Sequence, residues 1–576
     1  MKRILTGSLT LLMVVIMNIK CSSDNQSKTY YVSPDGNDDN LGLSENAAWK
    51  TIEKLNSVVF KPCETILFES GGLWKGQLRP QGNGEPDKPI TISSFGKGSR
   101  PIIDIGKEAG VGIQLVNQSW WEILGIEITS GAQPELGFRR GGISATTEGD
   151  GKQIEHIVIR DCYIHDIWGQ VGGEYTGVAI YVGPLFSFKA NGQICKNCSA
   201  ADVLIENNKI IRVDKIGIVV WGSLSVETLL QPKSEQMQRN TPLLDSNNII
   251  IRGNYLENLG GDGIIIFGAH RGLIEFNITD RTCLRTGDPD LNTGKESRYS
   301  WWPHTASIWL AGCTETIMQF NEVYNTGRQP ANGDGEAYDF DFGCKNCVLQ
   351  YNYSQNNAGF LLIMDNTFRN IARYNISEND VKFRPTHLIS MFCDTTEQNL
   401  IHNNVFYVDH GTSDIDCYYG DEYGPKKGKG QKDKSILGAH FMNNIFYATG
   451  QGRFRTVYSY GDSLNSAEYR KLDASVKLPP PVHGTKFYHN CYFGPWLNRL
   501  PDDPEKLLAD PMFVAPGAGG IGLSTLSGYK LRDGSPCLNA GVFIEMDSKR
   551  DFYGNPITEG AIDIGVYEKN GQKHER

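Results

Sequence analysis

The chain has 576 residues, of which 39% are apolar and 21% charged, and its formal net charge is −10. This composition indicates a folded chain rather than a disordered one, and nothing in it suggests the basic face of a nucleic-acid-binding protein. The 64 glycines suit a fold with many tight turns. The length sets no domain count, because repeat folds grow by stacking units rather than by enlarging one core.

The first 21 residues have the features of an export signal. Lys2 and Arg3 precede an apolar stretch, 4–19, which is too short to span a membrane stably. Cys21 resembles the lipidated cysteine of bacterial lipoproteins, although Lys20 stands where a small residue is usual. We expect an exported outer-membrane or cell-surface lipoprotein, with a periplasmic or secreted protein as the alternative. Residues 22–28 are expected to be a short linker.

One pattern recurs along the rest of the chain: a short apolar strand, then an asparagine, then a bulky residue one or two places later. The spacing between these asparagines is 23 residues at its shortest, and the longer steps are consistent with one turn plus a loop insertion. Asp161 marks an earlier turn of the same kind. The recurring asparagines are Asn208, Asn254, Asn277, Asn321, Asn352, Asn375, Asn404, Asn444 and Asn490.

These repeats predict an all-β solenoid. Each repeat is too short for a strand–helix–strand unit, but it is long enough for one coil of three short strands rich in Ile, Val, Phe and Tyr. Stacked coils bury one continuous core. The asparagines are expected to lie at the turns, where their amides bond to the backbone and to the asparagines above and below. We therefore assign them a structural role.

Large loop insertions are expected at about 183–200, 224–246, 280–303 and 410–435, and loops on one side of a solenoid usually form its binding groove. The third insertion leads into Trp301, Trp302 and His304. Adjacent tryptophans suit stacking on sugar rings, although they could equally cap the core.

Aligning the repeats on their asparagines brings five strands side by side, and one of them, 333–343, carries charge. Asp339 and Asp341 are two residues apart, so they share one face of the strand. Tyr338, Phe340 and Phe342 share the other face. In this alignment the two aspartates lie level with apolar side chains of the neighbouring strands, namely Ile264, Ile266, Ile308, Leu310, Leu362 and Met364.

Asp365 and Asp394 fall at equivalent positions in the next two coils, which gives a patch of four aspartates. Neighbouring coils lie roughly 4.8 Å apart and same-face residues roughly 6.5–7 Å apart, and both are separations at which two carboxylates cleave a glycosidic bond. We expect Asp339, Asp341 and Asp365 to be catalytic. Asp365 and Asp394 could instead satisfy N–H groups of turns.

A calcium site is the alternative use of these carboxylates. Asp334 and Glu336 lie in the same segment and could add oxygen ligands. A lysine or arginine would then take the proton in an elimination, with Lys345, Arg328 and Arg369 as candidates. A further acidic residue, Asp262, stands between glycines, which favours a role in a turn over a role in catalysis.

Both ends of the chain fit a known pattern. The segment 30–52, beginning Tyr-Tyr-Val-Ser-Pro-Asp-Gly, and the closing segments 510–519, 529–542, 551–556 and 562–568 resemble the ends of extracellular proteins of the pectate-lyase-like superfamily. With the repeats, the resemblance covers nearly everything after residue 28. It implies a single right-handed parallel β-helix over 29–570, including its capping segments, with a groove formed by loops. The superfamily contains glycoside hydrolases and polysaccharide lyases, so the fold alone does not fix the reaction.

We therefore expect a carbohydrate-active enzyme, most simply a glycoside hydrolase that uses an aspartate pair and no cofactor. A calcium-dependent lyase of a uronate polymer and a non-catalytic carbohydrate-binding surface protein are the alternatives. The expected partner is a polysaccharide or oligosaccharide, with no nucleic acid, membrane contact only through the lipid, and a monomeric state. Residues expected to bind substrate are Trp301, Trp302, His304, Arg328, Glu336 and Asp394.

Overall fold

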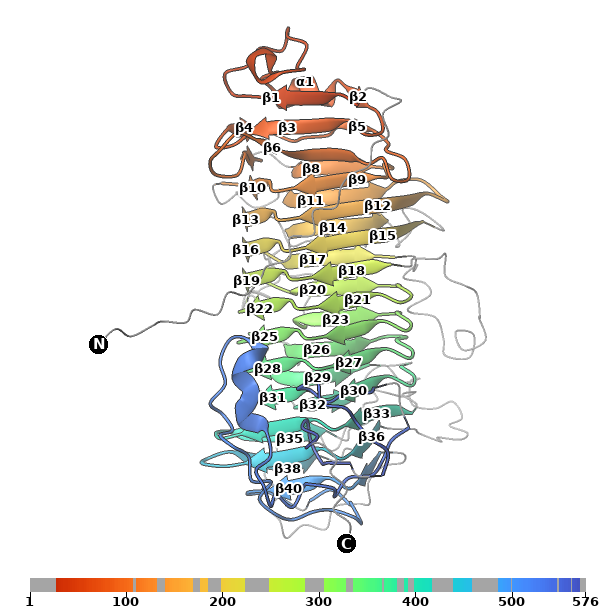
Figure 1. Cartoon of the computed structure of the whole chain (residues 1–576), viewed down its shortest axis with the longest axis vertical. Coiled ribbons are helices and arrows are strands. Elements are labelled where there is room, and N and C mark those ends of the chain that lie inside the picture. Colours follow the sequence, from red (N-terminus) through yellow and green to blue (C-terminus); the bar gives the residue numbers. More distant parts are fainter. Residues whose placement is uncertain are drawn as a thin grey trace, which may run out of the picture.

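The computed structural model of the chain is a right-handed parallel β-helix, in which short strands stack into three long sheets (Figure 1). It describes residues 27–106, 110–131, 140–168, 177–184, 198–222, 248–284, 305–327, 335–364, 367–380, 388–391, 398–416, 439–457, 485–498, 500–545, 548–560 and 562–569.

Sheet 1 has 14 strands in the described part of the chain, and all of its pairings are parallel. They are β1 (Thr29–Val32), β3 (Thr65–Glu69), β6 (Ile90–Phe95), β9 (Trp121–Leu124), β12 (Gln153–Arg160), β15 (Ser199–Glu206), β18 (Ile249–Arg252), β21 (Leu273–Glu275), β24 (Ile317–Gln319), β27 (Val348–Gln350), β30 (Ile371–Arg373), β33 (Asn399–His402), β36 (Ala439–Met442) and β39 (Lys486–Tyr488).

Sheet 2 has 13 strands within the same described ranges. They are β4 (Leu73–Lys75), β7 (Ile102–Asp104), β10 (Glu127–Thr129), β13 (Tyr163–Ile167), β16 (Lys209–Val213), β19 (Tyr255–Leu259), β22 (Ile278–Asp280), β25 (Glu322–Tyr324), β28 (Tyr353–Gln355), β31 (Ile376–Glu378), β34 (Val405–Val408), β37 (Ile445–Ala448) and β40 (Cys491–Phe493).

Sheet 3 has 11 described strands and carries the acidic strand predicted from the sequence. They are β8 (Gly110–Val116), β11 (Arg140–Thr147), β14 (Val178–Pro184), β17 (Ile216–Trp221), β20 (Ile264–Phe267), β23 (Ile308–Ala311), β26 (Glu336–Asp341), β29 (Gly359–Ile363), β32 (Ile389–Met391), β35 (Thr412–Asp416) and β38 (Arg453–Val457).

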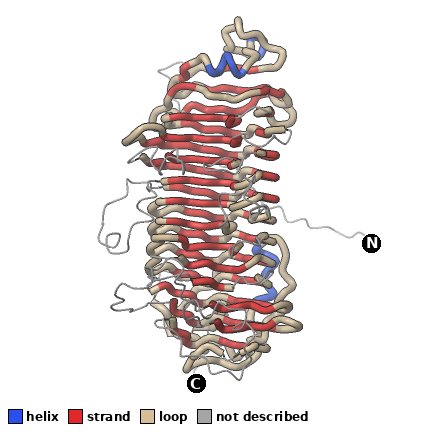
Figure 2. Tube along the Cα trace, turned by 180° about the vertical axis from the view of Figure 1, so that it is seen from behind, coloured by secondary structure: helices blue, strands red, loops and turns tan. Residues whose placement is uncertain are grey.

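Each coil passes from sheet 1 to sheet 2 to sheet 3 and then enters the next coil, as β18, β19, β20 and β21 illustrate. Seen from behind, the strands form one continuous stack (Figure 2). The N-terminal end carries η1 (Glu45–Ala47), α1 (Ile52–Asn56) and the small pair β2 (Val59–Phe60) and β5 (Gln81–Gly82). Inward-facing side chains of all three sheets form one apolar core along the axis, as a solenoid requires.

The predicted asparagine ladder is confirmed at the corner between sheets 1 and 2. The Asn352 amide nitrogen donates to Asn375 Oδ1 at 3.0 Å, and Asn321 donates in the same way to Asn352. The same contact joins each successive pair of asparagines from Asn208 to Asn490. At the earlier turn the ladder position is occupied by Cys162, whose backbone N–H donates to Asn208, and Asp161 precedes it.

The residue before each ladder asparagine has a positive φ, which turns the chain sharply into sheet 2. Four of these residues are aromatic and stack on the outside of the corner, with ring centroids 5.0, 5.1 and 6.0 Å apart in turn. They are Phe276, Phe320, Tyr351 and Tyr374, with φ between 50° and 58°. Aromatic stacking along the axis thus accompanies a backbone conformation that bulky residues rarely adopt.

The C-terminal segment after β40 runs back along the outer face of sheet 2 instead of adding further coils. Its short helix η6 (Leu523–Tyr529) lies beside β25, β28 and β31 (Figure 1, blue). Leu526 and Tyr529 pack with Tyr353 and Tyr407 in a second buried cluster. The Tyr529 hydroxyl donates to the buried Glu378 carboxylate at 2.5 Å, so a charge-assisted bond fixes the segment to the sheet.

Of the described residues, none belongs to a helix that is both long and apolar enough to cross a membrane. The export signal and Cys21 lie outside the described residues.

Candidate active site

The two central aspartates lie on β26 and face away from the core. Tyr338 and Phe340 point inward and are buried in the main core. The Tyr338 hydroxyl reaches the backbone carbonyls of Asn321 and Tyr353, at 3.1 and 3.0 Å. Because side chains alternate along a strand, anchoring Tyr338 inward directs Asp339 and Asp341 to the outer face of sheet 3. The predicted sharing of one face by the two aspartates is confirmed.

The structure shifts the predicted neighbours of the two aspartates by one residue in β23 and β20. Asp339 pairs with Trp309 and Asp341 with Ala311, whereas Ile308 and Leu310 pair with Tyr338 and Phe340. In β20 the equivalent outward residues are therefore Ile265 and Phe267 rather than Ile264 and Ile266. In β29, the strand on the other side of β26, the prediction was right for Leu362, which pairs with Asp339.

The error has a simple cause in chain length. Ile308 precedes Asn321 by 13 residues (321 − 308), whereas its partner Tyr338 precedes Asn352 by 14 (352 − 338). The turn after β26 thus holds one more residue than the turn after β23. An alignment counted back from the asparagines is therefore wrong by one residue between β23 and β26. An error of one residue exchanges the two faces of a strand.

The two carboxylates have different surroundings. Asp339 is 5% exposed and lies level with Trp309 and Leu362. Asp341 is less buried, and its Oδ1 accepts the backbone N–H of Phe342 at 2.8 Å. Residues two apart on one strand face are roughly 6.5–7 Å apart at their Cα atoms. Two carboxyl groups act on one glycosidic bond when they are about 5–9.5 Å apart, and side chains from such neighbouring positions can reach that separation.

An aromatic strip leads along sheet 3 to Asp339. Trp221 and Phe267 are stacked with ring centroids 4.1 Å apart, and Phe267 meets Trp309 edge-on at 5.1 Å. These side chains are the large members of an apolar cluster on the outer face of the sheet, separate from the core. Trp309 then adjoins Asp339 in the next coil. The three rings are buried, at 2–4% exposed, and they form one row with the acidic pair along the axis of the solenoid.

Asp262 fixes the last ring of the aromatic strip. Its Oδ1 accepts the Trp309 indole Nε1–H at 2.9 Å and the backbone N–H of Ala306 at 3.1 Å. Sequence reasoning assigned Asp262 to a turn, and it does lie at the corner before β20. Its second role could not be read from the sequence, because Trp309 lies 47 residues further on.

Asp262 is fully buried and is electrostatically coupled to a buried lysine. Burial raises the pKa of Asp262 to about 7, against the opposing effects of its bond from Trp309 and of the Lys215 charge. Burial likewise lowers the pKa of Lys215 to about 8, and the Asp262 charge opposes that shift. Both groups thus titrate close to neutral pH, and they lie two and three coils before the acidic strand β26.

Glu336 lies at the buried start of β26, with 1% of its surface exposed. Its backbone carbonyl accepts the N–H of Ser307, whose hydroxyl bonds to Thr279 and Thr282 at 2.7 and 3.0 Å. Burial raises the pKa of the nearby Cys283 thiol, and Asp262 and Glu336 add to that effect. The start of the acidic strand is therefore packed against a buried polar cluster.

The remaining predicted residues are not all described by the structure. Lys345 and Arg369, considered as bases for an elimination, lie at the corner between sheets 3 and 1, where Arg369 donates to Gln398 at 2.9 Å. Among the residues that are described, no group of three or more His, Cys, Asp or Glu side chains is arranged to hold a metal ion. Asp365, Asp394, Trp301, Trp302, His304 and Arg328, and most of the four predicted insertions, lie outside the described residues.

A search with models of protein families finds no match. The chain is 25% identical to a lacto-N-biosidase of Bifidobacterium longum subsp. longum in an alignment that covers 95% of this chain and 37% of the relative. The chain thus spans little more than a third of the length of this curated relative.

Two solved structures resemble this chain in fold. The native and selenomethionine crystal structures of a GH136 lacto-N-biosidase from Eubacterium ramulus align with TM-scores of 0.52 and 0.54. Each is 21% identical and covers 75% of this chain and 67% or 68% of the other. The predicted resemblance to β-helical carbohydrate-active proteins is confirmed: this chain shares its right-handed parallel β-helix with a lacto-N-biosidase.

Proposed function

We propose that this protein is a glycoside hydrolase that cleaves a lacto-N-bioside, with Asp339 and Asp341 as its catalytic pair. The observation that carries the proposal is the placement of two carboxylates on one outward face of β26, at the end of an aromatic strip. The alignment with a lacto-N-biosidase over 95% of this chain supports the choice of reaction and substrate.

The surroundings of the two carboxylates divide their roles. Asp339 is the more buried of the two and lies beside Trp309 and Leu362. It is suited to protonate the leaving oxygen as the general acid. Asp341 accepts a backbone N–H, which favours the ionised form. It is suited to activate water or to attack the anomeric carbon.

The rest of the predicted site belongs to the same proposal. Asp365, predicted from the sequence to be catalytic, would be the third carboxylate of the site. Sugar rings would be held by Trp301, Trp302, His304, Arg328 and Asp394. Glu336, also predicted to bind substrate, is buried at the start of β26 and would act by positioning that strand.

We also propose that the protein is exported and carries lipid on Cys21. Metabolic labelling with a palmitate analogue in a bacterial host should mark the wild-type chain and not Cys21→Ser. Equal labelling of both chains would refute the anchor and leave the hydrolase proposal untouched.

The activity is tested with a chromogenic lacto-N-bioside and a panel of other glycosides and uronate polymers. Mass spectrometry of the products decides the reaction, since hydrolysis adds one water and elimination adds none. Proton NMR of the first-formed anomer then gives the stereochemical outcome. Hydrolysis that survives a chelator supports the proposal. Absence of hydrolysis across the panel, or an unsaturated product that requires calcium, would overturn it.

A further inference from the structure

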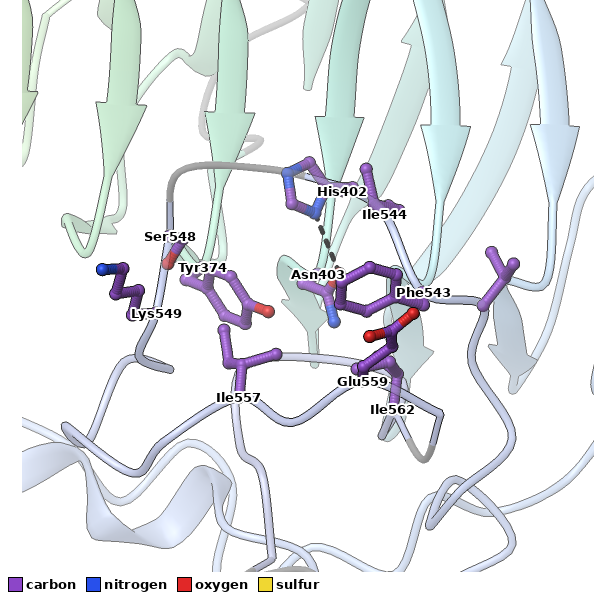
Figure 3. A pocket seen from close by; sticks show the side chains of 11 residues that line it. Tyr374, His402, Asn403, Phe543, Ile544, Ser548, Lys549, Ile557, Glu559 and Ile562 are labelled. Atoms are coloured by element: carbon purple, nitrogen blue, oxygen red, sulfur yellow. Dashed lines mark hydrogen bonds between the residues drawn. The ribbon is translucent and has the colours of Figure 1, made fainter.

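A pocket of about 210 Å³ lies far from β26, between the corner of sheets 1 and 2 and the C-terminal segment (Figure 3). Its floor is formed by side chains at the ends of β30 and β33. Apolar side chains of the C-terminal segment form most of its walls. The pocket is lined by Tyr374, His402, Asn403, Val542, Phe543, Ile544, Ser548, Lys549, Ile557, Glu559 and Ile562.

The walls of this pocket are held in place by hydrogen bonds on both sides. Val542 exchanges two bonds with the Asn443 side chain, at 2.8 and 3.0 Å. On the opposite wall the Tyr351 hydroxyl contacts Ser548 and the Arg550 carbonyl, at 2.8 and 2.7 Å. Gly541 also donates its N–H to the Ile562 carbonyl at 2.8 Å. The pocket is thus formed by anchored segments on the solenoid.

His402 lines this pocket and has one hydrogen-bond acceptor that no described residue uses. The Asn403 amide nitrogen donates to the carbonyls of Asp563 and Gly565, both at 3.1 Å, so its Oδ1 is the acceptor that faces His402 Nδ1 at 2.9 Å. Nδ1 must therefore carry the proton, which leaves a lone pair on Nε2. Nε2 is buried and has no hydrogen-bond partner among the described residues. A buried polar atom without a partner is costly.

The charges around the pocket favour a neutral ligand. Burial lowers the pKa of His402 to about 3, and the positive charge of Arg373 contributes to that shift. The imidazole therefore stays neutral and accepts a bond, and the same positive charge disfavours a cationic donor beside it. At the exposed rim Lys549 and Glu559 carry opposite charges, so the rim favours neither an anion nor a cation. The ligand must therefore supply a neutral donor, and a hydroxyl group is such a donor.

The apolar lining and the size define the shape of the ligand. Phe543 is 41% exposed and Tyr374 directs its hydroxyl toward the interior (Figure 3). Aromatic faces next to polar groups suit a ring with an apolar face and hydroxyl edges. A cavity of about 150 Å³ already holds benzene, so this pocket has room for one six-membered ring with its substituents.

We propose that the pocket is a second carbohydrate site, which binds one neutral pyranose unit through a hydroxyl donated to His402 Nε2 and through stacking on Phe543. The site lies on a different face from β26 and would hold a glycan while another part of it is cleaved. Its occupancy does not depend on the proposed hydrolysis.

The test uses the full-length protein labelled with ¹⁵N-histidine and titrated with methyl β-galactopyranoside and with methyl N-acetyl-β-glucosaminide. The chain has 11 histidines, and the His402 ring signals are assigned from their loss in His402→Phe. A saturable shift of Nε2 of His402 alone with either glycoside supports the site. No shift of that nitrogen up to tens of millimolar of either sugar, or the same shift with cyclohexanol, would overturn it.

Two alanine variants provide a control that leaves the histidine intact. Phe543→Ala should weaken the glycoside by about two- to tenfold, the loss expected for one aromatic contact. Phe276→Ala removes an exposed ring outside the pocket (53% exposed) and should leave the affinity unchanged. Equal affinities for all three chains would show that no stacking occurs in the pocket and would refute its assignment to a sugar.

Discussion

Asp262 and Trp309 are joined by a 2.9 Å hydrogen bond between neighbouring coils, and this bond orients the indole that lies beside Asp339. The carboxylate is buried and faces Lys215 from the next coil on the other side. A bond to a charged acceptor is stronger than one between neutral groups. The conformation of the aromatic strip therefore depends on a carboxylate that lies two coils before the strand of Asp339 and Asp341.

The first prediction concerns this bond. Trp309→Phe removes the indole N–H and leaves Asp262 with one donor fewer. At pH 8.5, above the pKa of about 7, Asp262 is ionised and we expect a loss of about 1.5–3 kcal/mol in the free energy of unfolding. Urea denaturation followed by circular dichroism measures it. Trp74→Phe is the matched control, because that indole donates at 2.9 Å to a neutral carbonyl, that of Lys50. It should lose only about 0.5–1.5 kcal/mol from the hydrogen bond. Equal losses would mean that the Asp262 charge adds nothing.

The second prediction concerns the acidic pair. Asp339→Asn and Asp341→Asn should each lower kcat for the chromogenic lacto-N-bioside by about 10²- to 10⁴-fold, the usual contribution of a general acid or base. The circular dichroism spectrum should be unchanged in both, because the two side chains face away from the core. Initial rates at substrate saturation are the measurement.

Three further variants test whether catalysis is confined to Asp339 and Asp341. Asp365→Asn and Asp334→Asn test the other acidic residues near β26, and exposed Asp87→Asn is the control that should keep full activity. If either of the first two abolishes activity while Asp339→Asn does not, Asp339 is not the acid. Wild-type rates in both Asp339→Asn and Asp341→Asn would remove the pair from catalysis altogether.

The fold could be predicted because its main signal is local and repeated. The asparagines occupy the same corner in each coil from Asn208 to Asn490, and each bonds to the next. The face of β26 could also be predicted, since alternation is a property of one strand. The register between β26 and β23 could not be predicted. The turn after β26 contains one extra residue, which shifts the pairing by one position. Neither composition nor periodicity reveals that residue.

Contacts between coils were the part that sequence reasoning missed. Asp262 lies 47 residues from Trp309, and 47 from Lys215 (262 − 215). Neither separation matches the shortest repeat of 23 residues, because the insertions between coils differ in length. The pocket at His402 has the same origin, since Phe543 and His402 meet only when the C-terminal segment folds back over the solenoid.

The third prediction tests the ladder. The Asn352 side-chain nitrogen donates to the carbonyls of Met318 and Gln350 and to Asn375 Oδ1, and its oxygen accepts from Asn321. Asn352→Ala leaves several buried groups without partners, at about 1–3 kcal/mol each. We expect a clear fall in the melting temperature. Asn37→Ala removes an exposed asparagine that accepts one bond within a turn and should melt like the wild type. Identical melting of both variants would contradict the ladder as a source of stability.

The last prediction concerns the dependence of stability on pH. His156 lies between the carboxylates of Glu122 and Asp202, at 3.3 and 2.7 Å, and stacks on Trp120 with centroids 4.4 Å apart. Burial tends to lower the pKa of His156, but the bonds and charges of Asp202 and Glu122 outweigh it and raise the pKa from 6.5 to about 9. The folded state thus binds the proton more tightly than the unfolded state. The stabilisation is full below pH 6.5 and is lost as the pH rises through 9.

Replacing His156 by asparagine, which tolerates the positive φ of 52° at this position, should therefore destabilise the protein by about 1–3 kcal/mol at pH 6. The difference from the wild type should shrink steadily toward pH 9.5. His440→Asn is the control of opposite sign, because burial lowers the pKa of His440 and Lys486 adds to that effect. In that variant the stability relative to the wild type should rise as the pH falls below 6.5. Melting curves from pH 5 to 10 measure both. A deficit in His156→Asn that stays constant over this range would show that the imidazole stabilises the coil by packing on Trp120, without help from its charge.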